Sequence, residues 1–69
     1  MESLGEALPK EMARVRELIT HYRDPMLNGA GNWAAMMMEQ SLQEADKAVM
    51  SGNVVAMIGA YNDLKEYNE

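Results

Sequence analysis

Apolar residues in the first third of the chain recur at spacings that place them on one face of a helix. Intervals of four, three, four and three residues separate Leu8, Met12, Val15, Ile19 and Tyr22. This spacing is typical of an amphipathic α-helix with one buried face. Pro9 suits the first helical position, where its missing N–H has no partner in any case. The pattern predicts a helix over about residues 8–23.

The residues before this helix carry a second, conflicting signal. Ser3 and Glu6 have the spacing of a capping box, which marks a helix start. A helix begun at Ser3 would be interrupted by Pro9, because proline lacks the N–H that a helix interior requires. We therefore expect a separate short turn upstream of residue 8.

The stretch "DPMLNGAGN", residues 24–32, ends the first pattern. The proline disfavours helical geometry at Asp24, and two glycines add conformational freedom. Asn32 is a good N-cap for a second helix over about residues 33–50. Its predicted buried face consists of Ala35, Met38, Leu42, Ala45 and Val49.

A short link separates the second helix from a third. Gly52 fits the position just past a helix end, where left-handed geometry is needed. Asn53 then caps a helix over about residues 54–67, whose predicted buried face is Val54, Met57, Ile58, Tyr61 and Leu64. So short a link forces the second and third helices into an antiparallel hairpin. The predicted fold is all-α: one three-helix domain over residues 1–69.

The size of the chain favours self-association. A domain of 69 residues buries only about 60% of its unfolded surface and is marginally stable alone. Small domains usually gain stability from disulfides, a metal or oligomerisation. The chain has no cysteine, so disulfides and thiolate metal sites are excluded. A homo-oligomer, most simply a dimer, is expected.

Charge and hydropathy exclude several partners. The net charge is −5, which repels phosphate backbones, so no direct nucleic-acid binding is expected. No segment approaches the ~20 apolar residues of a membrane span, and the N-terminus lacks the basic and apolar regions of a signal peptide. We expect a soluble, cytoplasmic protein that is not associated with a membrane.

Candidate residues for chemistry are few. His21 follows Glu17 by four residues, and a carboxylate at that spacing can orient an imidazole. We interpret His21 as a solvated residue near a helix C-terminus, where positive charge is favourable; an enzyme that uses His21 is the alternative. Met36, Met37 and Met38 lie about 100° apart around a helix, so they cannot converge on a copper ion. No catalytic, cofactor-binding or metal-binding residue is predicted.

Six successive apolar residues, Trp33 to Met38, pose the most specific question. They sweep through more than a full helical turn, so this half of the helix is apolar all round and must be covered on every side. The two other helices cover only two sides. Met26 and Leu27 of the connection are expected to fold onto the core, and one alternative is that they cover the remainder. The other is a subunit interface, since methionine and tryptophan are enriched in interface cores. The predicted interface residues are Trp33, Met36, Met37, Met26 and Leu27.

Two resemblances extend this interpretation. The segment "ADKAVMSGNVVAMIGAYNDL" resembles one tetratricopeptide-type helix pair, although a solenoid needs at least about three repeats. The combination of "LPKEMARVREL", "EQSLQEADKAVMSGNVVAMI" and "YNDLKE" resembles a group of short bacterial and prophage proteins. That resemblance implies a bacterial or phage source and carries no activity and no site residues.

These observations predict a small acidic, non-catalytic interaction module that self-associates. The alternative is a phage-encoded inhibitor or adaptor that binds a host protein, for example a defence protein. Methionine side chains adapt to more than one partner shape, which is compatible with either function.

Overall fold

The structure is a computed structural model that describes residues 2–68, so residues 1 and 69 of the predicted domain lie outside the described part. Within this range the chain is helical and has no strand. Its elements, in order, are α1 (Leu4–Tyr22), the 3₁₀ helix η1 (Pro25–Leu27), α2 (Asn32–Ser51) and α3 (Val54–Lys65). The predicted all-α, three-helix class is confirmed.

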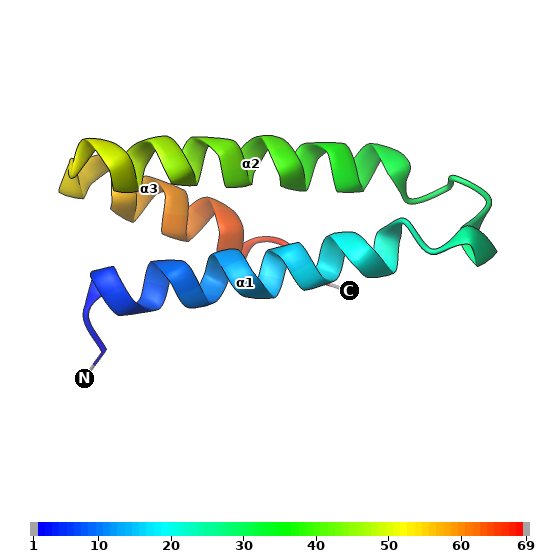
Figure 1. The fold of residues 1–69 in the computed structure, drawn as a ribbon, viewed down its shortest axis with the longest axis horizontal. Helices are drawn as coiled ribbons and strands as arrows, with labels where there is room; N and C mark the ends of the chain where they lie inside the picture. The colour runs from blue at the N-terminus through cyan, green and yellow to red at the C-terminus, as the bar shows by residue number, and fades with distance from the viewer. Residues whose placement is uncertain (1, 69) are drawn as a thin grey trace.

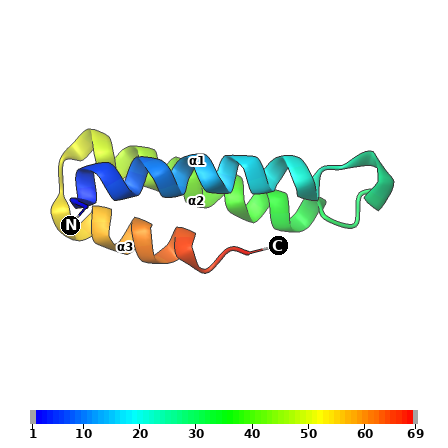
Figure 2. The ribbon, with the colours of Figure 1, turned by 90° about the horizontal axis from the view of Figure 1, so that it is seen from below.

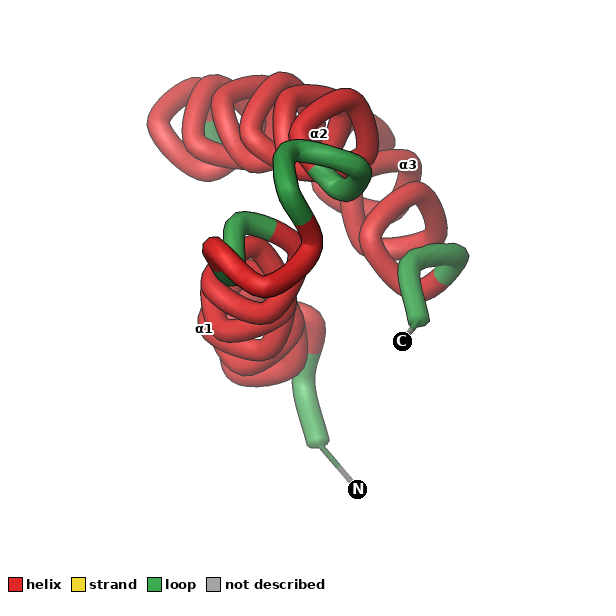
Figure 3. The backbone as a smooth tube through the Cα atoms, turned by 90° about the vertical axis from the view of Figure 1, so that its right-hand side faces the viewer, coloured by secondary structure: helices red, strands yellow, loops and turns green. Residues whose placement is uncertain are grey.

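The two long helices lie side by side and antiparallel along the length of the molecule (Figure 1). Helix α3 turns back from the end of α2 and runs beside it (Figure 2). Viewed from the end, α1 and α3 lie on the same side of α2, one toward each flank (Figure 3). The described residues form a body of 38 × 23 × 15 Å, with the long connection at one end and the α2–α3 hairpin at the other.

One hydrophobic core joins the three helices. Its fully or nearly buried residues are Leu8, Met12, Val15 and Leu18 of α1; Ala35, Met38, Leu42, Ala45 and Ala48 of α2; and Leu64 of α3. Three predicted core positions, Val49, Val54 and Ile58, are exposed. On α3, the predicted residues Met57 and Tyr61 do pack partly against the core, whereas Val54 and Ile58 are left uncovered by the described elements. Val49 is left uncovered in the same way near the end of α2.

Helix α1 begins four residues earlier than expected. It starts at Leu4, with Ser3 at the N-cap and Pro9 inside the helix. The carbonyl of Ser3 accepts hydrogen bonds from the amides of Glu6 at 3.1 Å and Ala7 at 2.8 Å. Proline removes one internal hydrogen bond, and the packing of Leu4 against the core offsets that loss. The predicted separate turn before residue 8 is wrong.

The α2–α3 hairpin follows the prediction closely. Gly52 has a φ of 69°, the left-handed geometry expected just past a helix end. The side chain of Asn53 accepts a hydrogen bond from the amide of Ala56 at 3.2 Å and so caps α3. The predicted N-cap of α2 is wrong: Gly31 occupies the cap, and Asn32 is the first helical residue.

Residues 66–68 leave the helical path that was predicted to continue to residue 67. Arg14 of α1 donates hydrogen bonds to the carbonyls of Leu64 and Tyr67. The hydroxyl of Tyr67 donates to the carbonyl of Met37 at 3.2 Å and lies 2.8 Å from the hydroxyl of Ser41 on α2. Because the single tyrosine proton points to Met37, the serine is the donor of the second bond. This C-terminal segment therefore joins α1 to α2.

Candidate interaction surfaces

The α1–α2 connection has a defined backbone. The Asp24 carboxylate accepts a hydrogen bond from the amide of Met26 at 2.9 Å and caps η1. Asn28 then adopts the left-handed conformation with a φ of 51°. Gly31 is buried against α1 so tightly that a Cβ atom there would lie 2.1 Å from the carbonyl oxygen of Tyr22. Only glycine allows this approach, which sets where α2 begins relative to the end of α1.

Met26 and Leu27 do not fold onto the core, contrary to the expectation from sequence. Met26 is 88% exposed and Leu27 is 42% exposed. The reason is the path of the backbone: the connection extends beyond the ends of α1 and α2 before it returns (Figure 1). The two side chains therefore add to the exposed apolar surface at this end.

The apolar segment at the start of α2 divides between core and solvent. Met38 is 2% exposed and lies in the core, whereas Trp33 is 70% exposed. Met36 and Met37 also face outward, so the three consecutive methionines point in different directions. The exposed apolar residues at this end are Met26, Leu27, Trp33, Met36 and Met37, and we call them the loop-end surface. They are the five residues predicted as an interface.

Polar contacts hold the backbone beneath the loop-end surface. The guanidinium of Arg23, just after α1, pairs with the carboxylate of Glu39 on α2 at 2.7 Å. Two residues earlier on α2, the Met37 carbonyl accepts the hydrogen bond from Tyr67. Between these groups and Asp24, residues 25–38 include no charged side chain. The surface is thus uncharged and supported on both flanks.

A second exposed apolar surface, which the sequence analysis missed, lies around the α2–α3 turn. We call it the hairpin-end surface, and its residues are Val49, Met50, Val54, Val55 and Ile58. The five successive apolar residues "VVAMI" at the start of α3 were the signal that could have revealed it. A helix that is apolar all round needs cover on every side, as argued for Trp33 to Met38. Three of these positions were instead assigned to the core.

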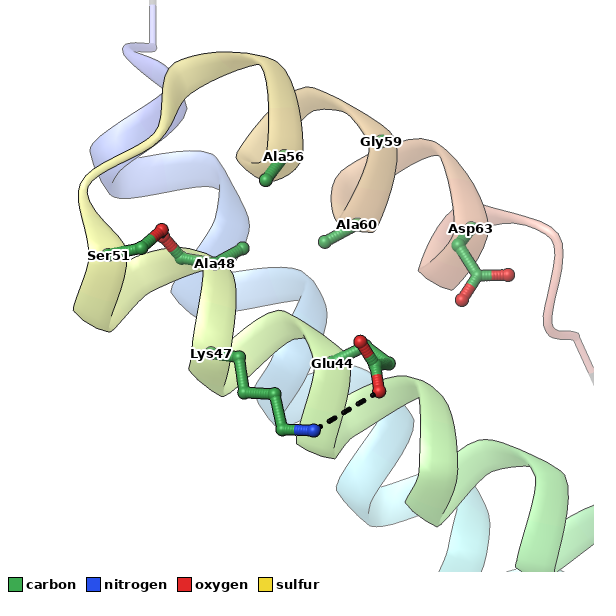
Figure 4. Close-up of a pocket in the computed structure, with 8 residues that line it drawn as sticks. All are labelled: Glu44, Lys47, Ala48, Ser51, Ala56, Gly59, Ala60 and Asp63. Carbon is green, nitrogen blue, oxygen red and sulfur yellow. Dashed lines mark hydrogen bonds and ion pairs between the residues drawn. The ribbon is translucent and has the colours of Figure 1, made fainter.

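A shallow groove of about 410 Å³ runs between α2 and α3. Small residues line its floor, with Ala48 and Ser51 of α2 across from Ala56 and Ala60 of α3 (Figure 4). Lys47 pairs with Glu44 at 3.6 Å on the α2 side, and both side chains are largely exposed. The groove follows from close helix packing through small side chains.

His21 lies in the last turn of α1, as predicted, and is exposed. It shares a small surface cavity of about 250 Å³ with Glu17, Arg14 and Leu18. The i, i+4 spacing of Glu17 and His21 therefore places both on one side of α1. Among residues 2–68, no three histidine, aspartate or glutamate side chains are grouped so that they could hold a metal ion.

Within the same described range, no helix combines the length and apolar character needed to cross a membrane. No family model, curated protein or solved structure matches this chain.

Proposed function

We propose that this protein is a small acidic, non-catalytic interaction module that self-associates through the loop-end surface. The observation that carries the proposal is the exposure of Trp33, Met36 and Met37 on a helix whose backbone is fixed by neighbouring polar contacts. Exposed apolar clusters on small proteins commonly mark contact sites. Tryptophan and methionine are also enriched in interface cores.

The expected strength of this contact is modest. Full burial of a methionine or leucine side chain contributes roughly 1.5–3 kcal/mol, and a tryptophan offers more area. Burial of the exposed parts of this surface on two copies contributes on the order of 10 kcal/mol. Association costs about 4–15 kcal/mol in lost freedom. The balance favours a reversible dimer that forms at micromolar or higher concentration.

The second candidate function is that of a phage-encoded inhibitor or adaptor that binds a host protein. The net charge of −5 favours this candidate, because a net acidic protein meets a basic partner faster through electrostatic attraction. A nucleic-acid-binding host factor or a defence nuclease with a basic groove is the class of partner expected. Association with such a partner slows as salt rises, since screening shortens the range of the attraction.

Sedimentation velocity across a concentration series tests the main proposal. The native protein should sediment faster as its concentration rises from about 1 to several hundred micromolar, which is the range that a weak interface implies. Met37→Glu places a charge in the interface and should shift the protein toward the monomer. Gln43→Glu, which adds the same charge to an exposed position farther along α2, is the matched control and should sediment as the native protein does.

Two outcomes would count against the proposal. If the native protein stays monomeric at every concentration measured, it does not self-associate and the proposal is wrong. A loss of assembly in both Met37→Glu and Gln43→Glu would indicate a general charge effect in place of a specific surface. For the host-partner alternative, affinity capture should return one protein that Trp33→Ala loses, and the oligomeric state should be measured in parallel.

A further inference from the structure

We infer that the hairpin-end surface is a second self-association site, and that it pairs with the same surface of another copy of this chain. It is distinct from the loop-end surface and does not depend on the function proposed for it. The two surfaces lie at opposite ends of a molecule 38 Å long (Figure 1). A contact at one end therefore leaves the other end accessible.

All five side chains of the hairpin-end surface are exposed, and no described element covers them. Met50 is 86% exposed and Val55 is 79% exposed, and Val49, Val54 and Ile58 are each more than two fifths exposed. The turn that joins them is well formed, with Gly52 in left-handed geometry and Asn53 capping α3. The apolar side chains thus project from a closed helical hairpin whose backbone polar groups are largely satisfied.

The hairpin-end surface carries little net charge, although the chain as a whole carries a net charge of −5. Residues 48–62 include no charged side chain. Arg16 and Asp46 line a cavity together with Val49 and Met50, and these two charged side chains form an ion pair with each other. A second copy brings the same acidic surface, so like charges would oppose contact over most of the molecule. At the hairpin end this repulsion is small, because the acidic Asp46 beside the surface is paired with Arg16. The surface therefore fits another copy of this chain better than a strongly basic partner, which would gain little from an acidic group that is already paired.

The apolar area of the hairpin-end surface is large enough for a small interface. A fully exposed aliphatic side chain offers roughly 60–120 Å² of apolar surface, so the five residues together offer about 200–400 Å². The smallest stable interfaces bury about 600 Å² from each partner, of which somewhat more than half is apolar. The hairpin-end surface reaches this lower bound when the uncharged turn residues around it are included. It suits a small two-fold contact.

A two-fold contact, hairpin end against hairpin end, closes at a dimer when it acts alone, and it extends assembly beyond the dimer when the loop end also pairs. Isologous pairing of this kind is the commonest symmetry among soluble oligomers. The competing arrangement places the hairpin end of one copy on the loop end of the next, and it does not close unless it forms a ring. The two arrangements predict different behaviour when only one end is altered.

The experiment compares four proteins by sedimentation velocity at several hundred micromolar: the native chain, Val55→Glu, Met37→Glu and the double variant. Val55 lies in the first turn of α3, where an acidic residue is favourable to the helix dipole, so this substitution preserves the fold of the monomer. Circular dichroism at 222 nm confirms helicity for each protein. Val55→Thr, which is uncharged and of similar size, is a milder second variant at the same site.

If both surfaces pair isologously, the native protein forms species larger than a dimer. Val55→Glu then stops at a dimer held by its loop ends, Met37→Glu stops at a dimer held by its hairpin ends, and the double variant is a monomer. If Val55→Glu assembles as the native protein does, the inference is wrong, whatever Met37→Glu shows. If each single variant is already a monomer, the contact joins the hairpin end of one copy to the loop end of the next. That result would overturn the isologous pairing. If Met37→Glu alone matches the native protein, the loop-end proposal fails and the hairpin-end inference stands.

Discussion

The guanidinium of Arg14 in the middle of α1 donates a hydrogen bond, 2.9 Å long, to the carbonyl oxygen of Leu64 near the end of α3. A second bond, 2.8 Å long, reaches the carbonyl of Tyr67. Carbonyls in the last turn of a helix lack intrahelical partners, and positive charge is favourable there. Arg14 therefore attaches the end of α3, the shortest α-helix, to α1, which lies about 50 residues earlier in the sequence.

Loss of this side chain should weaken the protein measurably. We expect Arg14→Ala to lower the free energy of unfolding by about 2 kcal/mol, because two charge-assisted hydrogen bonds to carbonyls disappear. Arg16→Ala is the matched control, since Arg16 is exposed and its ion pair with Asp46 is 3.9 Å long; it should cost less than about 1 kcal/mol. Urea denaturation measures both, and equal losses would contradict the role assigned to Arg14.

Leu64 should be more costly to truncate than any other residue of α3. It is fully buried, whereas no other residue of α3 reaches the same burial. Leu64→Ala should destabilise the protein by about 2–5 kcal/mol, enough to detach α3 or unfold the chain. Asn62→Ala, an exposed change on the same helix, should have little effect. Thermal unfolding followed by circular dichroism checks both, and a Leu64→Ala protein with native stability would show that α3 is not anchored by this residue.

Two glycine-to-alanine substitutions should change stability in opposite directions. A Cβ at Gly31 would meet the backbone of Tyr22 at 2.1 Å, so Gly31→Ala should cost more than about 1 kcal/mol. A Cβ at Gly59 of α3 has nothing within 4 Å, and alanine is the better helix former by about 0.5–1 kcal/mol. Melting temperatures should therefore fall for the first and rise for the second. The same sign for both would contradict the packing described at Gly31.

A substitution at Gly52 tests whether the α2–α3 turn needs left-handed backbone geometry. Its φ of 69° is left-handed, and a Cβ there would touch nothing, so the cost of alanine is backbone strain alone. Gly52→Ala should destabilise by roughly 1 kcal/mol. A melting temperature equal to or above that of the native protein would indicate that α2 and α3 do not need this turn geometry.

Much of the fold could be predicted from sequence because local signals and burial agree. Gly52 and Asn53 were assigned their roles by turn and capping chemistry alone, and the core faces of α1 and α2 followed from their spacing. The start of α1 was not predicted, because Pro9 indicates a helix boundary locally, whereas the burial of Leu4 is a tertiary effect. Arg14 lies outside the apolar face, and its bonds to residues 50 and 53 positions away leave no pattern in sequence.

The candidate site was only half predictable for a related reason. Trp33, Met36 and Met37 were found by asking how many sides of a helix its neighbours can cover. The same question at Val54 and Val55 would have indicated exposed apolar surface, but the helical spacing assigned Val54 to the core. How far α1 and α2 cover α3 is a tertiary property, and the spacing of apolar residues along α3 does not contain it.

The emission spectrum of Trp33 reports whether self-association buries the loop-end surface, because this residue is the single tryptophan of the chain and lies on that surface. If that surface pairs with another copy, the emission maximum shifts to shorter wavelength as the native protein is concentrated. The shift appears over the same range in which sedimentation shows assembly, and it is absent from Met37→Glu. An emission maximum that stays at the wavelength of a solvated indole while the protein assembles would contradict the claim, since the contact would then lie elsewhere.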